Sequence, residues 1–233
     1  MAVAFGTIVT ALGTGANTGA SPSITTPATN PCVKVSVAVD STTVTLDSLT
    51  ITGFGGTASL CKEVRSGTAY CSVWKIVAPT ANTAGTVQAN FSASVNWQLM
   101  VETFPGSDQT DPMPTADAVT SVVESISETL TPSNLTANDA TSGSAASTVG
   151  NNPTGVNPNQ RYTDATTSVN AQSGDNTGTT GVTFTWDFAT GGFSKVKVAV
   201  RVKEAAAGGA TQAQIWPSIQ QGILNPMIGR LYV

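Results

Sequence analysis

The chain has 233 residues, a length that suits one large β domain or two small ones. Charged residues make up 10% of the chain, against about 25% in a typical soluble domain, and the net charge is −4. This balance disfavours general binding to nucleic acid, and the weak charge favours a protein whose surface is covered by neighbours in an assembly.

The N-terminal residues are rich in Gly, Ala, Thr, Ser and Pro. This composition predicts an extended N-terminal arm over residues 1–31, with one short strand at FGTIVTAL. The pattern changes at Cys32, where alternating apolar and polar residues begin. We therefore expect the folded domain to start there.

Six segments before residue 105 alternate with the period of a β-strand. They are residues 33–39, 43–53, 57–64, 69–77, 84–92 and 94–104. The sequence RSGT between the third and fourth segments predicts a β-hairpin with Gly67 in its turn.

The middle of the chain is less regular. Residues 105–115 are rich in turn-forming residues and predict a loop. Residues 116–130 fit a helix face or a strand, and we favour a strand because the neighbouring segments are β. Residues 131–160 are rich in Asn, Gly, Ser and Thr, which predicts a long loop. Such loops are usually functional, flexible or an interaction surface.

Strand patterns return at residues 161–171, 181–188 and 194–204. The chain then has about ten to twelve predicted strands and no secure helix. Residues 32–205 are therefore expected to form one all-β domain. A sandwich, a jelly roll and a barrel all remain open from residue spacing alone.

Several short motifs resemble a diffuse family of β-sandwich proteins from bacteriophage genomes. They are Trp74, the Ala78–Pro79 turn, Gly85–Thr86, the loop from Gly106 to Pro112, RYTD (161–164), VTFTW (182–186) and KVKVAVRV (195–202). Ser107 departs from the pattern, because valine is usual there. The resemblance covers about residues 33–204. It implies an antiparallel concanavalin-like or jelly-roll-like sandwich, a structural or adhesive role in a virion, and no catalytic residues.

The sequence offers few combinations of residues that could form a catalytic site. The chain has no histidine, which removes Ser-His-Asp and Cys-His catalysis and histidine metal ligands. No glycine-rich segment matches a phosphate-binding loop. Asp108 and Asp111 could bind Ca²⁺, but we favour a turn that the aspartates cap. We therefore expect no enzyme activity, no cofactor and no metal.

The three cysteines, Cys32, Cys61 and Cys71, are too few for an all-paired disulfide scaffold. Cys61 and Cys71 flank the RSGT turn, and a three-residue loop would place them opposite each other as a cross-strand disulfide. We favour free thiols, the usual state in a reducing cytoplasm. Cys32 is expected in the core.

Charge is unevenly distributed. No Lys or Arg lies between Lys75 and Arg161, an interval with seven acidic residues, whereas four of the ten basic residues lie in segment 195–203. The basic strip could meet an acidic strip on a neighbouring subunit. We favour a solvated outer face. Trp74, Trp97 and Trp186 are expected in the core or on a sheet face rather than on a sugar-binding surface.

The C-terminal segment, residues 206–233, is predicted to be an arm. Its two prolines interrupt a helix, and it carries one charge, Arg230. We favour docking of this arm into a neighbouring protein, with folding back onto its own sandwich as the alternative. The residues expected to bind the partner are Trp216, Ile219, Ile223, Leu224, Met227, Ile228, Leu231 and Tyr232.

These expectations converge on a bacteriophage virion structural protein, within which we favour a capsid decoration or cement protein. Its expected partners are other copies of itself, as a homo-oligomer, and virion proteins such as the major capsid protein. A host glycan is a further candidate partner, whereas nucleic acid and membrane are not expected. With no basic N-terminal segment of a secretory signal, the protein is expected in the virion after assembly in the host cytoplasm. The alternatives are a tail-fibre receptor-binding or carbohydrate-binding module and, third, a glycan-active enzyme.

Overall fold

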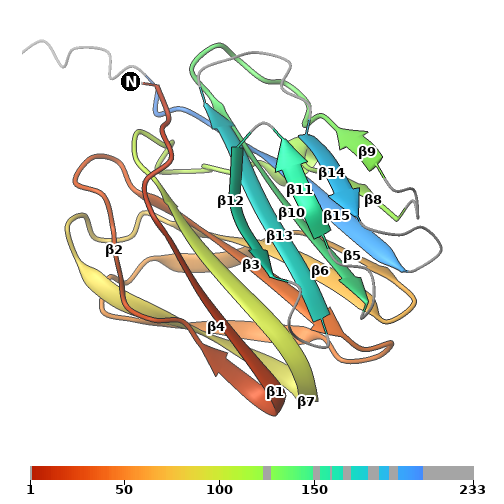
Figure 1. Ribbon diagram of the computed structural model, residues 1–233. Helices are drawn as coiled ribbons and strands as arrows, with labels where there is room; N and C mark the ends of the chain where they lie inside the picture. The colour runs from red at the N-terminus through yellow and green to blue at the C-terminus, as the bar shows by residue number, and fades with distance from the viewer. Residues whose placement is uncertain are drawn as a thin grey trace, which may run out of the picture.

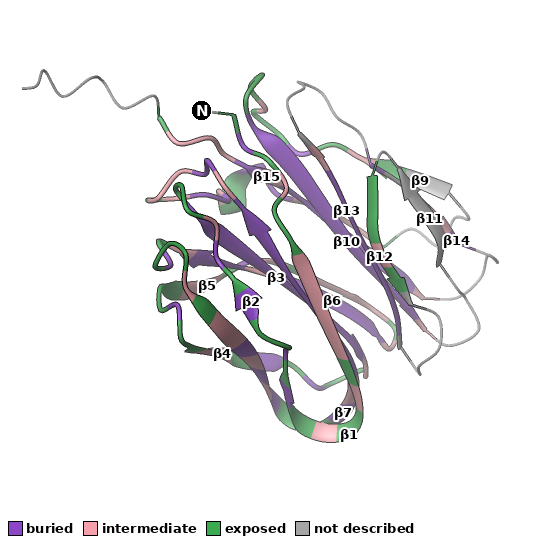
Figure 2. Cartoon of the chain, turned by 60° about the vertical axis from the view of Figure 1, so that its left-hand side comes forward, coloured by how far each residue is buried: buried purple, intermediate pink, exposed green. Residues whose placement is uncertain are grey.

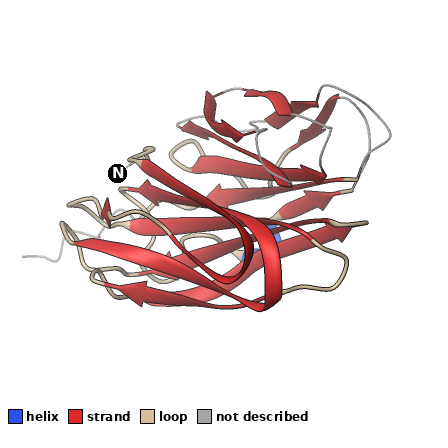
Figure 3. Ribbon diagram, turned by 60° about the horizontal axis from the view of Figure 1, so that its bottom comes forward, coloured by secondary structure: helices blue, strands red, loops and turns tan. Residues whose placement is uncertain are grey.

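The computed structural model describes residues 2–122, 127–148, 153–157, 159–164, 169–177, 184–188 and 194–206. Within these ranges the chain is antiparallel β-structure, and the single helical element is the short 3₁₀ turn η1 (Thr115–Asp117) (Figure 3). The prediction of an all-β sandwich is therefore confirmed.

The first half of the chain forms a large sheet, which we call the long sheet. Its strands run in the order β1-β7-β3-β6-β5, and β2 and β4 add onto β7. Their bounds are β1 (Ile8–Ala20), β2 (Ile24–Thr25), β3 (Cys32–Asp40), β4 (Leu46–Thr52), β5 (Thr57–Ser66), β6 (Ala69–Val77) and β7 (Ala84–Phe104).

The long strand β7 determines the shape of this sheet. It has 21 residues where the sequence predicted two separate strands. The first half of β7 pairs with β4, and its second half pairs with β3. The long sheet therefore folds over one of its own faces (Figure 1). The curl encloses an apolar core that contains Val35, Leu46 and Val87.

The second half of the chain forms two further sheets. The central sheet has the order β12-β13-β10-β15-β8 and the small sheet has the order β11-β14-β9. Their bounds are β8 (Val119–Ser121), β9 (Ser127–Leu130), β10 (Ala140–Thr148), β11 (Pro153–Asn157), β12 (Asn159–Asp164), β13 (Val169–Thr177), β14 (Phe184–Phe188) and β15 (Lys195–Val202).

The central sheet lies between the other two, and its strands β10, β13 and β15 are buried (Figures 1 and 2). Val196, Val198 and Val200 of β15 pack with residues of the long sheet, such as Cys71 and Met100. On the opposite face, Ala145 and Ala199 pack under Phe184, Trp186 and Phe188 of the small sheet.

Strand β10 corrects the prediction of a loop over residues 131–160. Its sequence, ATSGSAAST, contains no large apolar residue, yet eight of its nine residues are buried at the centre of the central sheet. Close packing against the small sheet explains why the side chains of β10 are small. A Cβ atom on Gly143 would lie 2.4 Å from Cζ2 of Trp186, so β10 needs glycine to fit beneath the small sheet.

The N-terminal segment is extended, as expected, but it belongs to the sandwich. Strand β1 pairs with β7 from Ile8 to Ala20, with irregular register after Gly13. Between Ile8 and Ala20, the arm predicted over residues 1–31 is therefore a strand of the long sheet, and its backbone hydrogen bonds are made there.

Two further local predictions can be compared with the structure. The described part of segment 116–130 contains the strands β8 and β9, which confirms the preference for strand over helix. Segment 161–171 was predicted as one strand, but it contributes to two antiparallel neighbours, β12 and β13. The β5–β6 hairpin has Gly67 in its turn with φ of 54°, as predicted.

Candidate functional site

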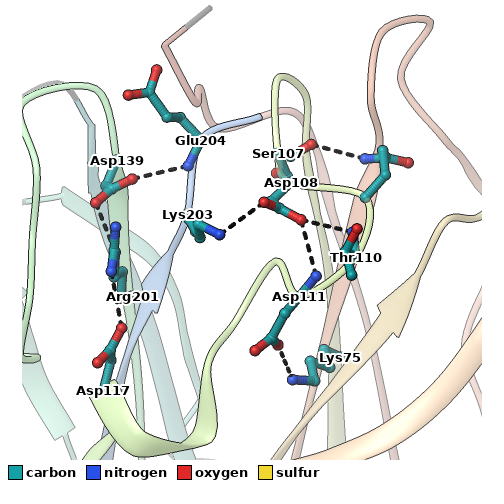
Figure 4. Close-up of polar contacts among 11 residues, drawn as sticks. Lys75, Ser107, Asp108, Thr110, Asp111, Asp117, Asp139, Arg201, Lys203 and Glu204 are labelled. Carbon is teal, nitrogen blue, oxygen red and sulfur yellow. Dashed lines mark hydrogen bonds and ion pairs between the residues drawn. The ribbon is translucent and has the colours of Figure 1, made fainter. Parts of the chain in front are cut away.

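The described chain ends beside the loop of residues 105–115, where it leaves the central sheet (Figure 4). The backbone N–H of Lys203 donates to the carbonyl of Pro112 at 2.8 Å, and that of Asp108 donates to the carbonyl of Lys203 at 2.9 Å. The backbone N–H of Ala205 donates to the carbonyl of Gly106 at 2.8 Å. We call this loop, together with Asp117, Asp139, Arg201, Lys203 and Glu204, the exit clasp.

Arg201 is the centre of the exit clasp. Its Nε lies 2.7 Å from Oδ2 of Asp139, and its Nη1 lies 3.0 Å from Oδ2 of Asp117. The Asp139 side chain has no exposed surface and that of Asp117 is 5% exposed. Burial lowers the pKa of Arg201, but the two carboxylates outweigh it and raise that pKa above its usual value.

The Asp139 carboxylate also accepts hydrogen bonds from two backbone N–H groups, one just before it in the chain and one just after β15. Its Oδ1 accepts a hydrogen bond from the N–H of Glu204 at 2.9 Å, and its Oδ2 accepts one from the N–H of Thr136 at 2.8 Å. Burial acts to raise the pKa of Asp139, but these two bonds and Arg201 lower it below its usual value. One carboxylate therefore ties the turn before β10 to the chain after β15.

Asp108 caps the turn of the 105–115 loop. Its Oδ1 accepts hydrogen bonds from the N–H groups of Thr110 and Asp111 at 2.7 and 3.0 Å, and Lys203 Nζ lies 2.9 Å from its Oδ2. Asp111 forms an ion pair with Lys75. The predicted aspartate-capped turn is confirmed. Among the described residues, no group of three or more His, Cys, Asp or Glu residues is placed to hold a metal ion.

The basic strip of β15 was predicted to be a solvated outer face, and this is wrong. Arg201 and Lys203 pair with acidic residues of the interval that lacks Lys and Arg. Lys195 and Lys197 are fully buried, with Nζ atoms 5.1 and 5.7 Å from the ring centroid of Phe188. The acidic and basic segments therefore meet within one chain.

A second polar group lies between the long and central sheets, and the sequence analysis missed it. Lys34 of β3 and Glu102 of β7 form an ion pair with an Nζ–Oε2 distance of 2.5 Å, and neither side chain has exposed surface. Lys34 Nζ also donates to Ser142 Oγ at 2.7 Å, and Ser173 donates to Oε1 of Glu102. Alternation could not reveal this pair, because Lys34 and Glu102 occupy the polar positions of β3 and β7, where the pattern predicts a solvated face.

Asp175 and Arg161 adjoin this buried group. Asp175 has no exposed surface and forms an ion pair with Arg161, whose side chain is 33% exposed. Burial raises the pKa of Asp175 above its usual value, against the opposing effect of Arg161, and the charge of Glu102 raises it further.

The three cysteines are free and buried, in agreement with the favoured interpretation. Cys71 pairs with Val64 across the hairpin, whereas Cys61 lies at a register shift of β5. Burial raises the pKa of Cys61 to about 11 and that of Cys71 to about 12. Both thiols therefore stay protonated near neutral pH, which makes them poor nucleophiles.

The tryptophans predicted for the core lie there. Trp97 and Trp186 are buried, and Trp74 packs against the core enclosed by the curled long sheet. None of the three forms an exposed platform for a sugar.

The predicted partner-binding residues all lie outside the described residues. They are Trp216, Ile219, Ile223, Leu224, Met227, Ile228, Leu231 and Tyr232. The exit clasp is the part of the structure that leads into this segment.

Comparison of the chain with protein-family models, with curated proteins and with solved structures finds no match. Across the described residues, no helix has the length and apolar character needed to cross a membrane.

Proposed function

We propose that this chain is a structural protein of a bacteriophage virion. It stabilises the capsid as a decoration or cement protein, through contacts with other copies of itself and with the major capsid protein. Its mechanism is binding alone, and its C-terminal segment supplies the apolar contacts. The motifs that resemble phage β-sandwich proteins support the virion assignment.

The exit clasp is the observation that carries this proposal. The chain beyond it holds ten apolar residues and one charge in residues 215–233. The clasp attaches this segment to the sandwich through backbone hydrogen bonds and buried ion pairs. A rigid attachment point reduces the entropy that the segment loses when it binds a neighbour, which favours an arm that docks between subunits.

The described chemistry supports binding rather than catalysis. The four aspartates of the exit clasp are paired with Arg201, Lys203 or Lys75, Glu204 accepts a hydrogen bond from Asn138, and the thiols are buried. These groups stabilise the fold and leave no nucleophile and base in contact, which acyl transfer would need.

The structure narrows the carbohydrate-binding alternative, which relied on Asn and Asp residues of a long loop over residues 131–160. Residues 140–148 of that segment form the buried strand β10, which contains no Asn or Asp. Before β10, Asp139 is buried, and the exposed Asn134 and Asn138 donate hydrogen bonds to Asp117 and Glu204.

The solution mass of the full chain beside a truncation that ends at Ala207 tests the proposal. The truncation keeps the exit clasp, so the sandwich should stay folded. We expect the full chain to form a defined oligomer and the truncated chain to be a folded monomer. Light scattering gives the mass, and circular dichroism gives the fold.

A full-length variant with Trp216→Ala, Leu224→Ala and Leu231→Ala is the matched control, because it keeps the length of the segment. We expect it to lose the oligomer as the truncation does. A compact monomer for both the full and the truncated chain would contradict self-association through this segment. Specific binding of the monomer to glycans would then favour the receptor-binding alternative.

A further inference from the structure

The buried pair of Lys34 and Glu102 is placed for a covalent reaction. The two residues lie directly opposite each other on the adjacent antiparallel strands β3 and β7. Their Nζ and Oε2 atoms are 2.5 Å apart, and both side chains have no exposed surface. We propose that Lys34 and Glu102 condense to form an intramolecular isopeptide bond that links β3 to β7.

Neither side chain has exposed surface, so no bulk water solvates the two ions of the pair. Two ions removed from water pay a large desolvation penalty, which neutral partners avoid. One proton that moves along the hydrogen bond from Nζ to Oε2 converts the pair into an amine and a carboxylic acid. The free amine is a nucleophile, and the protonated carboxyl carbon is the better electrophile.

The reaction balances without any further reagent. The lone pair of Nζ attacks Cδ of Glu102 and forms the new C–N bond. The Cδ–OH bond then breaks, and the hydroxyl leaves with one hydrogen of the amine as water. The product is a secondary amide, so no oxidant, metal or cofactor takes part.

Two serines of the central sheet are placed to assist. Ser173 donates a hydrogen bond to Oε1 of Glu102, the oxygen on which negative charge develops during the attack. Ser142 accepts a hydrogen bond from Nζ at 2.7 Å and so orients the amine. The pair is held by packing on both sheets, which supplies the proximity that a bimolecular reaction lacks.

The ion pair of Lys75 and Asp111 provides a comparison within the same chain. It is also a close lysine–carboxylate pair, but the side chain of Asp111 is 47% exposed. Water solvates the carboxylate of Asp111 there and stabilises its charged, unreactive form. We therefore expect this pair to remain an ordinary ion pair.

The intact mass of the purified full-length chain under denaturing conditions tests the proposal. We expect a mass lower than that of the sequence by one water molecule in most molecules. A tryptic digest should then lack cleavage after Lys34 and should contain one peptide that joins the Lys34 and Glu102 segments. Cleavage after Lys75 should be normal.

The variant Lys34→Arg is the matched control, because arginine keeps the positive charge and the hydrogen bonds but is a poor nucleophile. We expect its full sequence mass with the circular dichroism spectrum of the parent chain. Full mass and normal cleavage after Lys34 in the parent chain, after prolonged incubation of the folded protein, would overturn the proposal. A water loss mapped to another position would overturn it as well. Neither result bears on the oligomer test of the proposed function.

Discussion

Burial of lysine is the most unusual property at the scale of single residues. Lys34, Lys195 and Lys197 have no exposed surface, although lysine is almost never fully buried unless it is paired. Lys34 lies beside Glu102, and the Nζ atoms of Lys195 and Lys197 lie near the ring of Phe188. A chain with 10% charged residues has therefore placed several of its charges inside the sandwich.

Gly143 is the position at which a single substitution gives a clear test of packing between the central and small sheets. The φ angle of Gly143 is not in the left-handed region that favours glycine. The loss of unfolding free energy in Gly143→Ala therefore comes from contact between the new Cβ and Trp186. We expect this variant to lose about 1–3 kcal/mol of unfolding free energy through overpacking. Urea denaturation followed by circular dichroism measures the loss.

The same substitution in a Trp186→Leu background is its control. Leucine is smaller than tryptophan and leaves room for the added methyl group, so Gly143→Ala should cost clearly less there. An equal loss in both backgrounds would show that the contact with Trp186 is not the cause.

At the scale of elements, the exit clasp links the ends of neighbouring parts of the central sheet, in which β15 pairs with both β10 and β8. Arg201 belongs to β15, Asp117 to η1, and Asp139 to the turn before β10. The clasp therefore holds the ends of three elements at the point where the C-terminal segment begins (Figure 4). Its strength depends on the burial of its carboxylates, because exposed ion pairs contribute little.

The variant Arg201→Met should weaken the fold strongly. It leaves the buried carboxylates of Asp139 and Asp117 without their cation, and breaking a buried pair by removal of one partner costs about 3–5 kcal/mol. Urea denaturation should show this loss. Hydrogen exchange of the Ala205 amide, which donates to Gly106, should become faster.

Lys203→Met is the matched comparison for Arg201→Met. The Lys203 side chain is 39% exposed, so its pair with Asp108 should contribute at most about 1 kcal/mol. A loss at position 203 as large as the loss at position 201 would contradict the role of burial in the clasp.

At the scale of the whole molecule, the buried charges make stability depend on pH. The folded-state pKa values of Asp108 and Asp139 lie below 3.8, their value in the unfolded chain. Their contribution is therefore fully present above pH 3.8 and is lost as the pH falls through the folded-state values. Asp175 has the opposite sign, because its pKa is raised and its protonation favours the folded state.

We expect the urea midpoint of the parent chain to fall as the pH is lowered below 3.8. The Asp139→Asn variant removes one of the two responsible carboxylates. It should be less stable at neutral pH and should show a shallower decline in acid. Midpoints measured in parallel at several pH values test this, and parallel curves for the two proteins would contradict it.

The candidate site could be predicted from the sequence only in part. The turn-rich loop and its capping aspartate were predicted from residue types, since the capping bonds of Asp108 Oδ1 are local. Its ion pair with Lys203 was not predicted. The partners of Arg201 were not predicted, because Asp117 and Asp139 are 84 and 62 residues away in sequence. Nothing in the spacing of these residues indicates that they meet.

The sequence by itself determined the β class, the β5–β6 hairpin and the strands β3, β6 and β15, because alternation and turn residues act over a few neighbours. Only the tertiary structure decided that β10 is a buried strand and that β15 carries its lysines inside. A small or charged residue is tolerated in the core only when a particular neighbour fills the space or pairs the charge. Trp186 fills the space above Gly143, and Glu102 pairs the charge of Lys34. Glu102 reaches Lys34 when β3 pairs with β7, and Trp186 reaches Gly143 when the small sheet packs on the central sheet.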